Sequence, residues 1–331
     1  MSSRIQLPHH EGMVVKKTIG HYFVQNGGAP VRCEISNRLR KELVYPIADP
    51  SSLRRRVMEV RSLQVLDPVA VGDVVRFIDN GDGTGLIEEV LPRRSRLARR
   101  EAAGAASRRH TLEQVIVANL DQVVCVFSAA LPAPSWNLLD RYLVSAESLD
   151  LRSLVVITKM DLAGESPDLE EAVNTYRKIG YRVILTSSET GQGLDELRDA
   201  LRGQLSTLIG KSGVGKSSLL NALQPGLGLR VNAVSDFNGK GRHTTTHLEY
   251  IPLEIGGGVV DTPGMREFGL WQTGDDDPAL FFPEMRPLVG ACRFGLDCTH
   301  LDEPGCAVRR AVAAGAVTHR RYQSMLKITE D

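Results

Sequence analysis

The chain has 331 residues, of which 42% are hydrophobic and 24% are charged, and its formal net charge is zero. This composition is typical of a globular protein with a sizeable core, and the length allows two or three domains. No apolar run approaches the roughly 20 residues that span a bilayer, and the N-terminus lacks the pattern of a secretion signal. We therefore expect a cytoplasmic protein without a membrane partner.

The zero net charge hides an asymmetry along the chain. Residues 1–110 hold 19 Lys and Arg against 12 Asp and Glu, which gives +7, whereas residues 111–331 hold 21 against 28, which gives −7. A basic N-terminal part favours a polyanionic partner. The alternative is an ordinary solvated surface, which charge alone does not exclude.

Residues 1–92 predict a small β-domain. Short apolar runs are separated by turn signals and lie at 13–15, 22–24 and 71–78. The segment Asn80-Gly81-Asp82-Gly83 is a strong hairpin turn, because Asn, Asp and Gly accept positive φ. About five such strands suit an RNA-binding OB-fold barrel, although SH3-like barrels have a similar pattern. Residues 93–110 then predict a basic linker with little apolar content.

Residues 111–272 predict an α/β domain. Two continuous apolar runs, 123–127 and 154–157, are typical of strands buried on both faces of a parallel sheet. A further strand is expected at 183–185, and helical spacing occurs at 137–147, 169–179 and 194–201. Strands that alternate with helices in this way favour a doubly wound sheet.

A complete phosphate-loop motif, G-x-x-x-x-G-K-S, lies at 210–217. A short apolar strand leads in and a helical segment leads out, which is the context that the motif requires. We expect Lys216 to reach the β- and γ-phosphates and Ser217 to bind Mg²⁺. The expected nucleotide-binding residues are Gly210, Lys211, Ser212, Gly213, Val214, Gly215, Lys216, Ser217 and Ser218.

A guanine-reading motif, Thr158-Lys159-Met160-Asp161, directly follows the strand at 154–157. The Asp161 carboxylate would accept hydrogen bonds from guanine N1–H and N2–H₂, and adenine lacks that donor pair. The stem of Lys159 would pack over the base, while Thr158 stands where Asn is usual and keeps a hydroxyl for one polar contact. A second base-side loop is expected after the strand at 183–185, with Thr186, Ser187 and Ser188.

The motif Asp261-Thr262-Pro263-Gly264 predicts the second metal-side element. Asp261 would hold Mg²⁺ through water, and the Gly264 N–H would contact the γ-phosphate. The polar segment 241–246 predicts the first switch, in which we expect Thr245 to close on Mg²⁺ when GTP is bound.

Met265 stands where many GTPases place a water-orienting Gln. His243 is therefore the candidate to orient the attacking water, because a neutral imidazole accepts a proton near pH 7. Together with Lys216 and Thr245 it forms the expected catalytic set. The alternative is that His243 is an exposed loop residue without a role.

The order of these motifs differs from that of ordinary GTPases. There the phosphate loop precedes the base-reading motif. Here the base-reading motif at 158–161 comes first, the phosphate loop follows and the motif at 261–264 comes last. Such a rotation is hard to obtain by chance and predicts a circularly permuted GTPase.

Residues 273–331 predict a helical metal-binding domain. Cys292, Cys298, His300 and Cys306 follow the spacing C-x₅-C-x-H-x₅-C. Three thiolates and one imidazole suit a closed, structural Zn²⁺ site; the alternative is four unrelated buried residues. The odd count of five cysteines also favours a metal site over disulfides. Cys33 and Cys125 lie apart and are expected to be small buried hydrophobes.

The chain resembles one family over almost its whole length, the circularly permuted, ribosome small-subunit-dependent GTPase A family (RsgA, also called YjeQ). The resemblance rests on the phosphate loop at 210–219, the Cys/His spacing, and the segments at 118–121, 241–246 and 261–264. The chain departs from the family at Thr158, where Asn is more usual, at Lys211, where Gln is common, and in a longer, irregular segment at 43–67.

The resemblance implies an N-terminal OB-fold, a permuted GTPase core and a C-terminal zinc domain. It also implies a GTPase that binds rRNA, acts in late maturation of the small ribosomal subunit and hydrolyses GTP faster on that subunit, with His243 as the switch histidine. We expect GTP or GDP, the small subunit and its rRNA as partners, one structural Zn²⁺ and the Mg²⁺ of the nucleotide as metals, and a monomer. Because the second switch at 261–270 runs into the zinc domain, nucleotide state would move that domain against the barrel.

Three alternatives stay open. They are a regulatory GTPase that acts on a protein partner away from the ribosome, an RNA-binding protein with a purely structural nucleotide site, and an ATPase. Salt-sensitive binding to RNA would count against the first. The intact Lys216, Ser217 and Asp261 argue against the second. Turnover that is unchanged by Asp161→Asn would favour the third.

Overall fold

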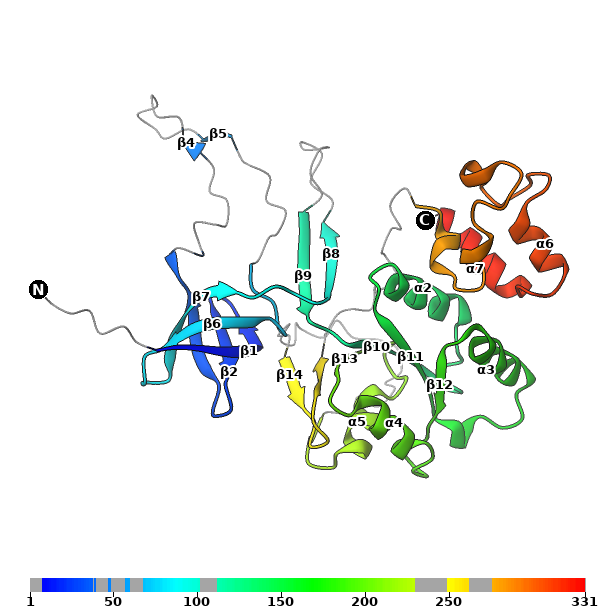
Figure 1. The fold of residues 1–331 in the computed structure, drawn as a ribbon. Helices are drawn as coiled ribbons and strands as arrows, with labels where there is room; N and C mark the ends of the chain where they lie inside the picture. Colours follow the sequence, from blue (N-terminus) through cyan, green and yellow to red (C-terminus); the bar gives the residue numbers. More distant parts are fainter. Residues whose placement is uncertain are drawn as a thin grey trace, which may run out of the picture. The chain divides into compact units, whose positions relative to one another are not determined.

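The computed structural model describes residues 8–37, 39, 47–48, 57–59, 68–101, 112–229, 249–261 and 276–330. The chain forms two compact units. The first consists of Met1–Leu120, Thr245–Ile251 and Val260–Pro263, and the second of Asp121–Thr244, Pro252–Val259 and Gly264–Asp331. Figure 1 labels most of the helices and strands of both units.

The first unit contains a closed five-stranded barrel. Its strands are β1 (His9–Thr18), β2 (His21–Gln25), β3 (Val31–Ile35), β6 (Val74–Asp79) and β7 (Thr84–Val90). They follow the order β1-β2-β3-β7-β6, and β1 pairs with β6 to close the barrel. The pair β3–β7 is parallel, and the other neighbours are antiparallel. This topology confirms the predicted OB-fold barrel.

The barrel core follows from the alternation of apolar residues along the strands. Val14, Val24 and Ile87 are completely buried, and so is Cys33, as the sequence predicts. The hairpin between β6 and β7 forms at the expected turn, where Asn80 N donates to Thr84 O at 3.0 Å. Gly85 is required beside this turn, because a Cβ there would lie 2.7 Å from Ile78 O and 2.8 Å from Cys33 Sγ.

The segment expected as a basic linker contains a strand. β8 (Arg96–Glu101) pairs antiparallel with β9 (Leu112–Ala118). At the entry to this hairpin, Arg93 forms an ion pair of 2.7 Å with the completely buried side chain of Asp73. Arg93, the first arginine of the segment 93–110, therefore has a structural partner. Part of this segment belongs to a strand and is not a linker.

Two further strand pairs belong to the first unit. β4 (Ile47–Ala48) and β5 (Val57–Glu59) form a small antiparallel pair, and the rest of the irregular segment 43–67 lies outside the described residues. β14 (Glu249–Pro252) pairs with β1 where Lys16 faces Glu249, and the two side chains form an ion pair of 3.0 Å.

The second unit is built on a parallel sheet with the strand order β12-β11-β10-β13. The strands are β10 (Gln122–Ser128), β11 (Arg152–Thr158), β12 (Arg182–Leu185) and β13 (Leu205–Ile209). Gly258 N, at the start of β15 (Gly258–Asp261), donates to Gln204 O at 2.9 Å, just before β13. All seven residues of β10 are buried, as expected for a strand covered on both faces.

Helices cover both faces of this sheet (Figure 1). α4 (Leu194–Leu201) and α5 (Lys216–Leu223) share a core with Val124, Val126 and Ile184. α2 (Trp136–Glu147) and α3 (Pro167–Ile179) lie on the other face, where Phe127 stacks on Tyr142 of α2. The start of α3 follows from its sequence, because Ser166 caps the helix by accepting from Leu169 N and Pro167 occupies the first turn. The doubly wound α/β fold is thus confirmed.

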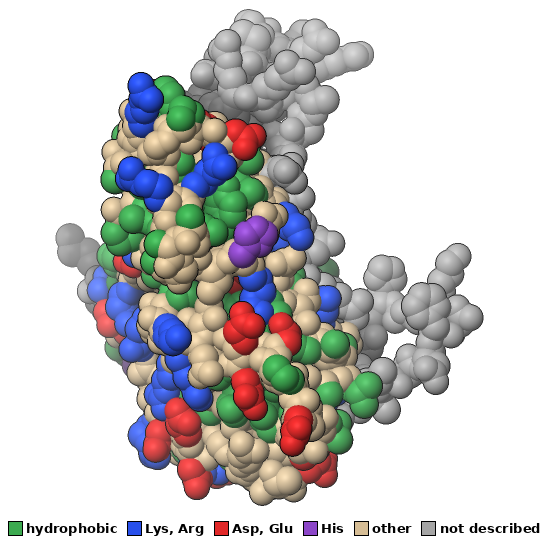
Figure 2. All heavy atoms as spheres, turned by 90° about the vertical axis from the view of Figure 1, so that its right-hand side faces the viewer, with side chains coloured by type: hydrophobic (Ala, Val, Ile, Leu, Met, Phe, Trp, Pro, Cys, Tyr) green, Lys and Arg blue, Asp and Glu red, His purple; other side chains and the backbone are tan. Residues whose placement is uncertain are grey.

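A C-terminal helical module packs on α2 within the same unit. It contains η3 (Pro278–Phe281), η4 (Arg286–Leu288), η5 (Gly295–Asp297), α6 (Ala307–Ala313) and α7 (His319–Glu330). Its core includes Phe282, Met285 and Met325 together with Val144 of α2. Figure 2 views this module and the α3 side of the sheet, and in its upper part hydrophobic side chains are exposed among basic ones. Among the described residues, no helix is both long enough and apolar enough to cross a membrane.

Candidate nucleotide site and metal centre

The parallel sheet brings the separated motifs to one edge. β10 ends at Ser128, β11 at Thr158, β12 at Leu185 and β13 at Ile209, and parallel strands that run in register end on the same side of the sheet. In open α/β sheets ligands bind outside the carboxyl ends of the strands. The base-reading motif, the second base-side loop and the phosphate loop therefore meet at one site, although their order in the chain is rotated.

The phosphate loop is the turn between β13 and α5. Gly210 has a φ of 155°, and a Cβ there would lie 2.2 Å from Val126 O, so only glycine fits at this position. Lys216 Nζ donates to Gly210 O at 2.6 Å and to Lys211 O at 3.0 Å. The lysine therefore lies over the loop, where the phosphates of a nucleotide bind in P-loop proteins. Lys211 and Ser212 are exposed, and Val214 is buried beneath the loop.

The base-reading motif is joined directly to the phosphate loop. The Thr158 hydroxyl is buried and donates to the backbone carbonyl Val214 O at 2.5 Å, and its oxygen lies 3.2 Å from Phe127 O. Lys159 has a left-handed backbone with φ 59°, and its Nζ donates to Gly213 O at 2.7 Å and also to Leu131 O. The hydroxyl that replaces the usual Asn amide thus connects two loops of the site.

The second base-side loop orients the carboxylate of Asp161, which the sequence predicts to read guanine. Ser187 Oγ donates to Asp161 Oδ1 at 2.5 Å, while the backbone N–H groups of Glu189 and Thr190 each donate to Ser187 Oγ at 3.2 Å. Asp161 itself is exposed at the sheet edge, and Ser188 beside the loop is half-buried. A carboxylate that is held by one oxygen and remains open to solvent has acceptor capacity for two donors of a base.

The metal-side motifs are described only in part. Ser217 and Ser218 are half-buried in the first turn of α5, directly after the loop. Asp261 is the last residue of β15. His243, Thr245 and Gly264 lie outside the described residues, so their predicted roles in water activation and magnesium binding stay predictions.

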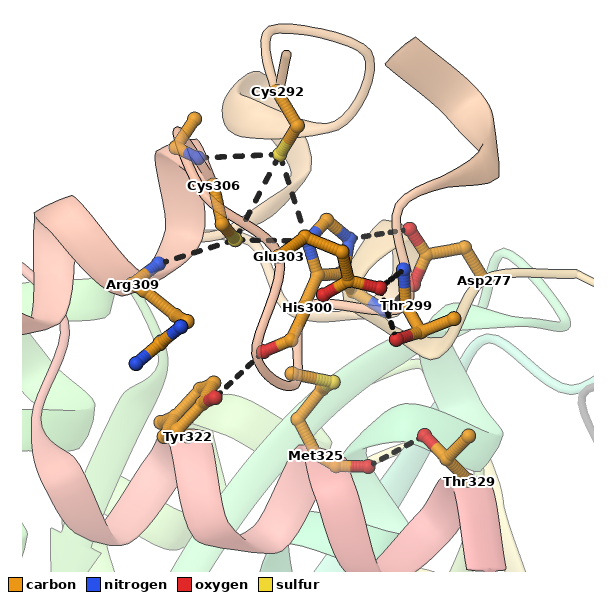
Figure 3. Close-up of polar contacts among 12 residues, drawn as sticks. Asp277, Cys292, Thr299, His300, Glu303, Cys306, Arg309, Tyr322, Met325 and Thr329 are labelled. Atoms are coloured by element: carbon orange, nitrogen blue, oxygen red, sulfur yellow. Dashed lines mark hydrogen bonds and ion pairs between the residues drawn. The ribbon is translucent and has the colours of Figure 1, made fainter. Parts of the chain in front are cut away.

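The four predicted metal ligands converge in the C-terminal module (Figure 3). All four are buried, and the ligand atoms of Cys292, Cys298, His300 and Cys306 lie within 4.8 Å of one another. His300 Nδ1 faces the cluster, 3.6 Å from Cys292 Sγ and 3.4 Å from Cys306 Sγ. Three thiols and one imidazole nitrogen at this spacing fit a closed tetrahedral site for a structural zinc ion.

Backbone hydrogen bonds reach two of these thiols. Ala307 N donates to Cys292 Sγ at 3.2 Å, and Arg309 N donates to Cys306 Sγ at 3.5 Å, where Cys306 caps α6. Burial raises the pKa of the Cys292 thiol, but the hydrogen bond from Ala307 and contacts with the other thiols outweigh burial and lower its pKa overall. A thiol with a lowered pKa is more often the thiolate that binds metal.

Asp277 is a site residue that the sequence analysis misses. Its Oδ2 lies 2.8 Å from His300 Nε2, and its Oδ1 accepts from Ala279 N at 2.9 Å and caps η3. The hydrogen bond to Asp277 places a proton on Nε2, which leaves Nδ1 for the metal. The available signal was the Asp-Pro pair that begins η3, a helix cap within the acidic turn.

The rotated motifs on one parallel sheet, in a chain that also contains a five-stranded barrel and a Cys/His module, define a circularly permuted P-loop GTPase. The family model for the RsgA GTPase matches residues 90–271. The chain therefore belongs to the RsgA GTPase family.

Similar proteins cover nearly the whole chain. A protein named small ribosomal subunit biogenesis GTPase RsgA from Gemmatimonas aurantiaca is 48% identical over 80% of this chain and 84% of its own length. A protein of the same name from Moorella thermoacetica is 39% identical and covers 96% of this chain and 95% of its own. The crystal structure of YjeQ from Thermotoga maritima has a TM-score of 0.69 at 30% identity and covers 98% of each chain. That of YloQ, described as a circularly permuted GTPase, has a TM-score of 0.68.

Proposed function

We propose that this GTPase binds the small ribosomal subunit and assists its late maturation, with GTP hydrolysis stimulated by the subunit. The observation that carries the proposal is the match to a small ribosomal subunit biogenesis GTPase at 39% identity over 96% of the chain. That match spans the barrel and the Cys/His module as well as the nucleotide motifs, so it concerns the whole assembly of domains. A cytoplasmic monomer is part of the proposal.

In the proposed site, the phosphate loop holds GTP and Asp161 reads guanine. Lys216 binds the β- and γ-phosphates, and its position over the carbonyls of Gly210 and Lys211 supports this role. The residues present fit a magnesium ion that supplies charge stabilisation to the phosphates, with Ser217 in the first turn of α5 and Asp261 at the end of β15. Thr245 and Gly264 complete the γ-phosphate side, and His243 orients the attacking water.

The Cys/His cluster would hold one structural zinc ion, and the buried donors of the four residues support this. In this proposal the barrel and the basic hairpin β8–β9 contact rRNA mainly through its phosphates. Arg93 is held by its ion pair with the buried Asp73, and the side chains of Arg94 and Arg96 are exposed.

We propose that the GTPase core and the C-terminal module of the second unit respond together to the bound nucleotide. The chain leaves the nucleotide site at Asp261 and enters the described part of the C-terminal module at Asp276. Arg321 of the module forms a buried ion pair with Asp140 of α2. In this proposal the module therefore does not move separately from the GTPase core. GTP would favour the subunit-bound form and hydrolysis would favour release.

The test is GTP hydrolysis measured with and without purified small ribosomal subunits, at low and high salt. We expect strong stimulation by small subunits, no stimulation by large subunits, and loss of stimulation at high salt because phosphate contacts release counterions. Equal turnover with and without small subunits would contradict the proposal and favour a regulatory GTPase with a protein activator. If stimulation is found, His243→Ala tests the proposed catalytic residue, and it should lower the stimulated rate without preventing subunit binding.

A further inference from the structure

The second unit has a cavity at the end of the sheet opposite to the nucleotide motifs. It has a volume of about 320 Å³, and residues that line it include Gln122, Arg152, Ser153, Arg182, Arg202 and Gln204. Gln122, Arg152 and Arg182 are the first residues of β10, β11 and β12. The nucleotide motifs follow the last residues of the same strands. With about 3.3 Å per residue, the seven residues of β11 separate the two sites by roughly 20 Å.

Three arginines surround this cavity, and one carboxylate, that of Asp199, also lines it. Arg182 is 50% exposed and contacts Glu196 at 3.4 Å, and Arg202 is 58% exposed and contacts Asp199 at 3.0 Å. Partly exposed ion pairs of this kind are weak, so an incoming anion competes with them at little cost. The cavity therefore has an excess of positive charge that its own carboxylate does not neutralise.

The arginines also retain unused donors. Arg152 donates from Nε to Asp121 O at 3.5 Å and from Nη2 to Gln204 Oε1. The contacts of Arg182 and Arg202 involve only Nη2. In the part of the chain that the structure describes, the Nη1 groups of all three make no hydrogen bond. A guanidinium group has five N–H donors, so each can bind an anion without giving up its present partner.

A buried hydroxyl in the wall lacks a partner. Ser153 Oγ is shielded from solvent, and among the described residues it makes no hydrogen bond. Leaving a buried hydroxyl unpaired costs free energy, so such a group indicates a ligand or an ordered water at that position. Ser153 follows Arg152 at the start of β11 and lines the same cavity, which places a neutral donor beside the cationic ones.

The wall itself is held in place by other hydrogen bonds. Gln122 Nε2 donates to Ala200 O at 2.9 Å and to Ser206 Oγ at 3.1 Å, which ties the start of β10 to the end of α4 and to β13. Asp121 Oδ2 accepts from Leu205 N at 2.8 Å, directly below this contact. Most of the lining residues therefore lie on strands of the sheet and on α4, as a preorganised binding site requires, while Arg202 and Gln204 lie in the turn between α4 and β13.

We propose that this cavity is a second anion site, which binds a phosphate group through Arg152, Arg182, Arg202 and Ser153. The guanidinium fork matches the geometry of phosphate oxygens. The Ser153 hydroxyl, which is shielded from solvent in this structure, donates to one more oxygen once its side chain turns toward the cavity. The volume is at the lower end of the range of small-molecule sites and admits a phosphate with an attached sugar. The phosphate belongs either to a free phosphate ester or to the sugar-phosphate backbone of RNA.

The experiment uses the full chain saturated with GDP and Mg²⁺, so that the phosphate loop is occupied. Ribose 5-phosphate is titrated at low salt, and the NMR signals of arginine Nε–Hε groups report the dissociation constant. A single-stranded RNA hexamer without a terminal phosphate is titrated in parallel by fluorescence anisotropy. The variants are Arg152→Gln, Arg182→Gln and Ser153→Ala. Arg310→Gln, an exposed arginine of α6, is the matched control.

If the site takes a free phosphate ester, each arginine variant weakens binding of ribose 5-phosphate roughly tenfold and the serine variant weakens it roughly threefold. If it takes RNA backbone, the same variants weaken binding of the hexamer severalfold and leave ribose 5-phosphate unchanged. Arg310→Gln changes neither value. Equal affinities of the wild type and the three variants for both probes overturn the proposal and leave the cavity to water. Because GDP occupies the phosphate loop throughout, and neither ribosomal subunits nor GTP turnover enter the measurement, this result is independent of the proposed ribosomal function.

Discussion

Arg321 and Asp140 form an ion pair that is almost completely removed from solvent. Arg321 Nη1 donates to Asp140 Oδ1 at 2.7 Å, and the side chains are 1% and 0% exposed. Glu284 accepts from Nε of the same arginine at 2.7 Å, and the guanidinium carbon lies 4.3 Å above the ring of Phe282. Asp140 belongs to α2 and Arg321 to α7, so this network attaches the metal-binding module to the nucleotide-binding core.

We expect Arg321→Ala to destabilise the second unit by about 3–5 kcal/mol, because it leaves the buried carboxylate of Asp140 without its cationic partner. Chemical unfolding measures this loss. The control is Arg286→Ala, which removes a half-exposed ion pair with Glu147 and should cost less than about 1 kcal/mol. Similar losses in the two variants would show that the buried network does not join the module to the core.

Asp277→Asn should weaken zinc binding by about 10–100-fold, because the carboxylate that orients His300 through Nε2 is replaced by a weaker acceptor. Competition with a chromogenic chelator measures the affinity. Asp276→Asn changes the charge equally at the preceding, exposed position and serves as the control. The four ligands are unchanged in both variants, so equal affinities would remove Asp277 from the metal site.

Thr158→Val should weaken GDP binding by roughly 5–30-fold. The variant keeps the shape of the side chain but leaves Val214 O without the hydroxyl donor, which loosens the contact between the base-reading motif and the phosphate loop. Thr158→Ser keeps the hydroxyl and should stay close to the wild type. Fluorescent GDP titrations compare the three proteins, and a serine variant as weak as the valine variant would show that the hydroxyl is not the group that matters for GDP binding.

Asp161→Asn should lower kcat/KM for GTP by roughly a hundredfold and raise turnover of xanthosine triphosphate, because the carboxylate no longer accepts from the guanine donors. Ser187→Ala, which removes the hydrogen bond that orients Asp161, should lower GTP turnover less and leave the base preference unchanged. Phosphate release with each nucleotide measures both effects. Unchanged GTP turnover in the asparagine variant would exclude Asp161 as the base reader.

Lys17 in β1 predicts a pH dependence of the first unit. Burial lowers its pKa from 10.5 to about 8. Between pH 8 and 10.5 the unfolded chain then binds more protons at Lys17 than the folded chain, so its contribution to stability rises with pH in this window. Lys17→Met should raise stability at pH 7 and flatten that rise, as measured by urea unfolding at several pH values. Lys16→Met, at a position paired with Glu249, should leave the rise intact.

The motif-bearing turns were predictable because their requirements are local. The phosphate loop needs glycine where a Cβ would meet Val126 O and a lysine that reaches back over the turn, and both are visible in the sequence of 210–217. The hairpin at 80–83 and the four metal ligands were predictable for the same reason, since their residue types and spacing already restrict the geometry. Strand β8 was not predicted. Arginines dominate its sequence, and the burial of Leu97 and Ala98 depends on pairing with β9.

By itself the sequence determined the chemistry of the nucleotide motifs, their rotated order, the alternation of strands and helices, and the donor set of the metal centre. Only the tertiary structure decided the partners of those groups. Asp277 reaches His300 across 23 residues, and Asp140 reaches Arg321 across 181. The physical reason is that a buried polar group needs a partner, and the packed chain can supply that partner from any position in the sequence. Turn geometry and ligand spacing leave a local sequence pattern, whereas such packing contacts leave none near either residue.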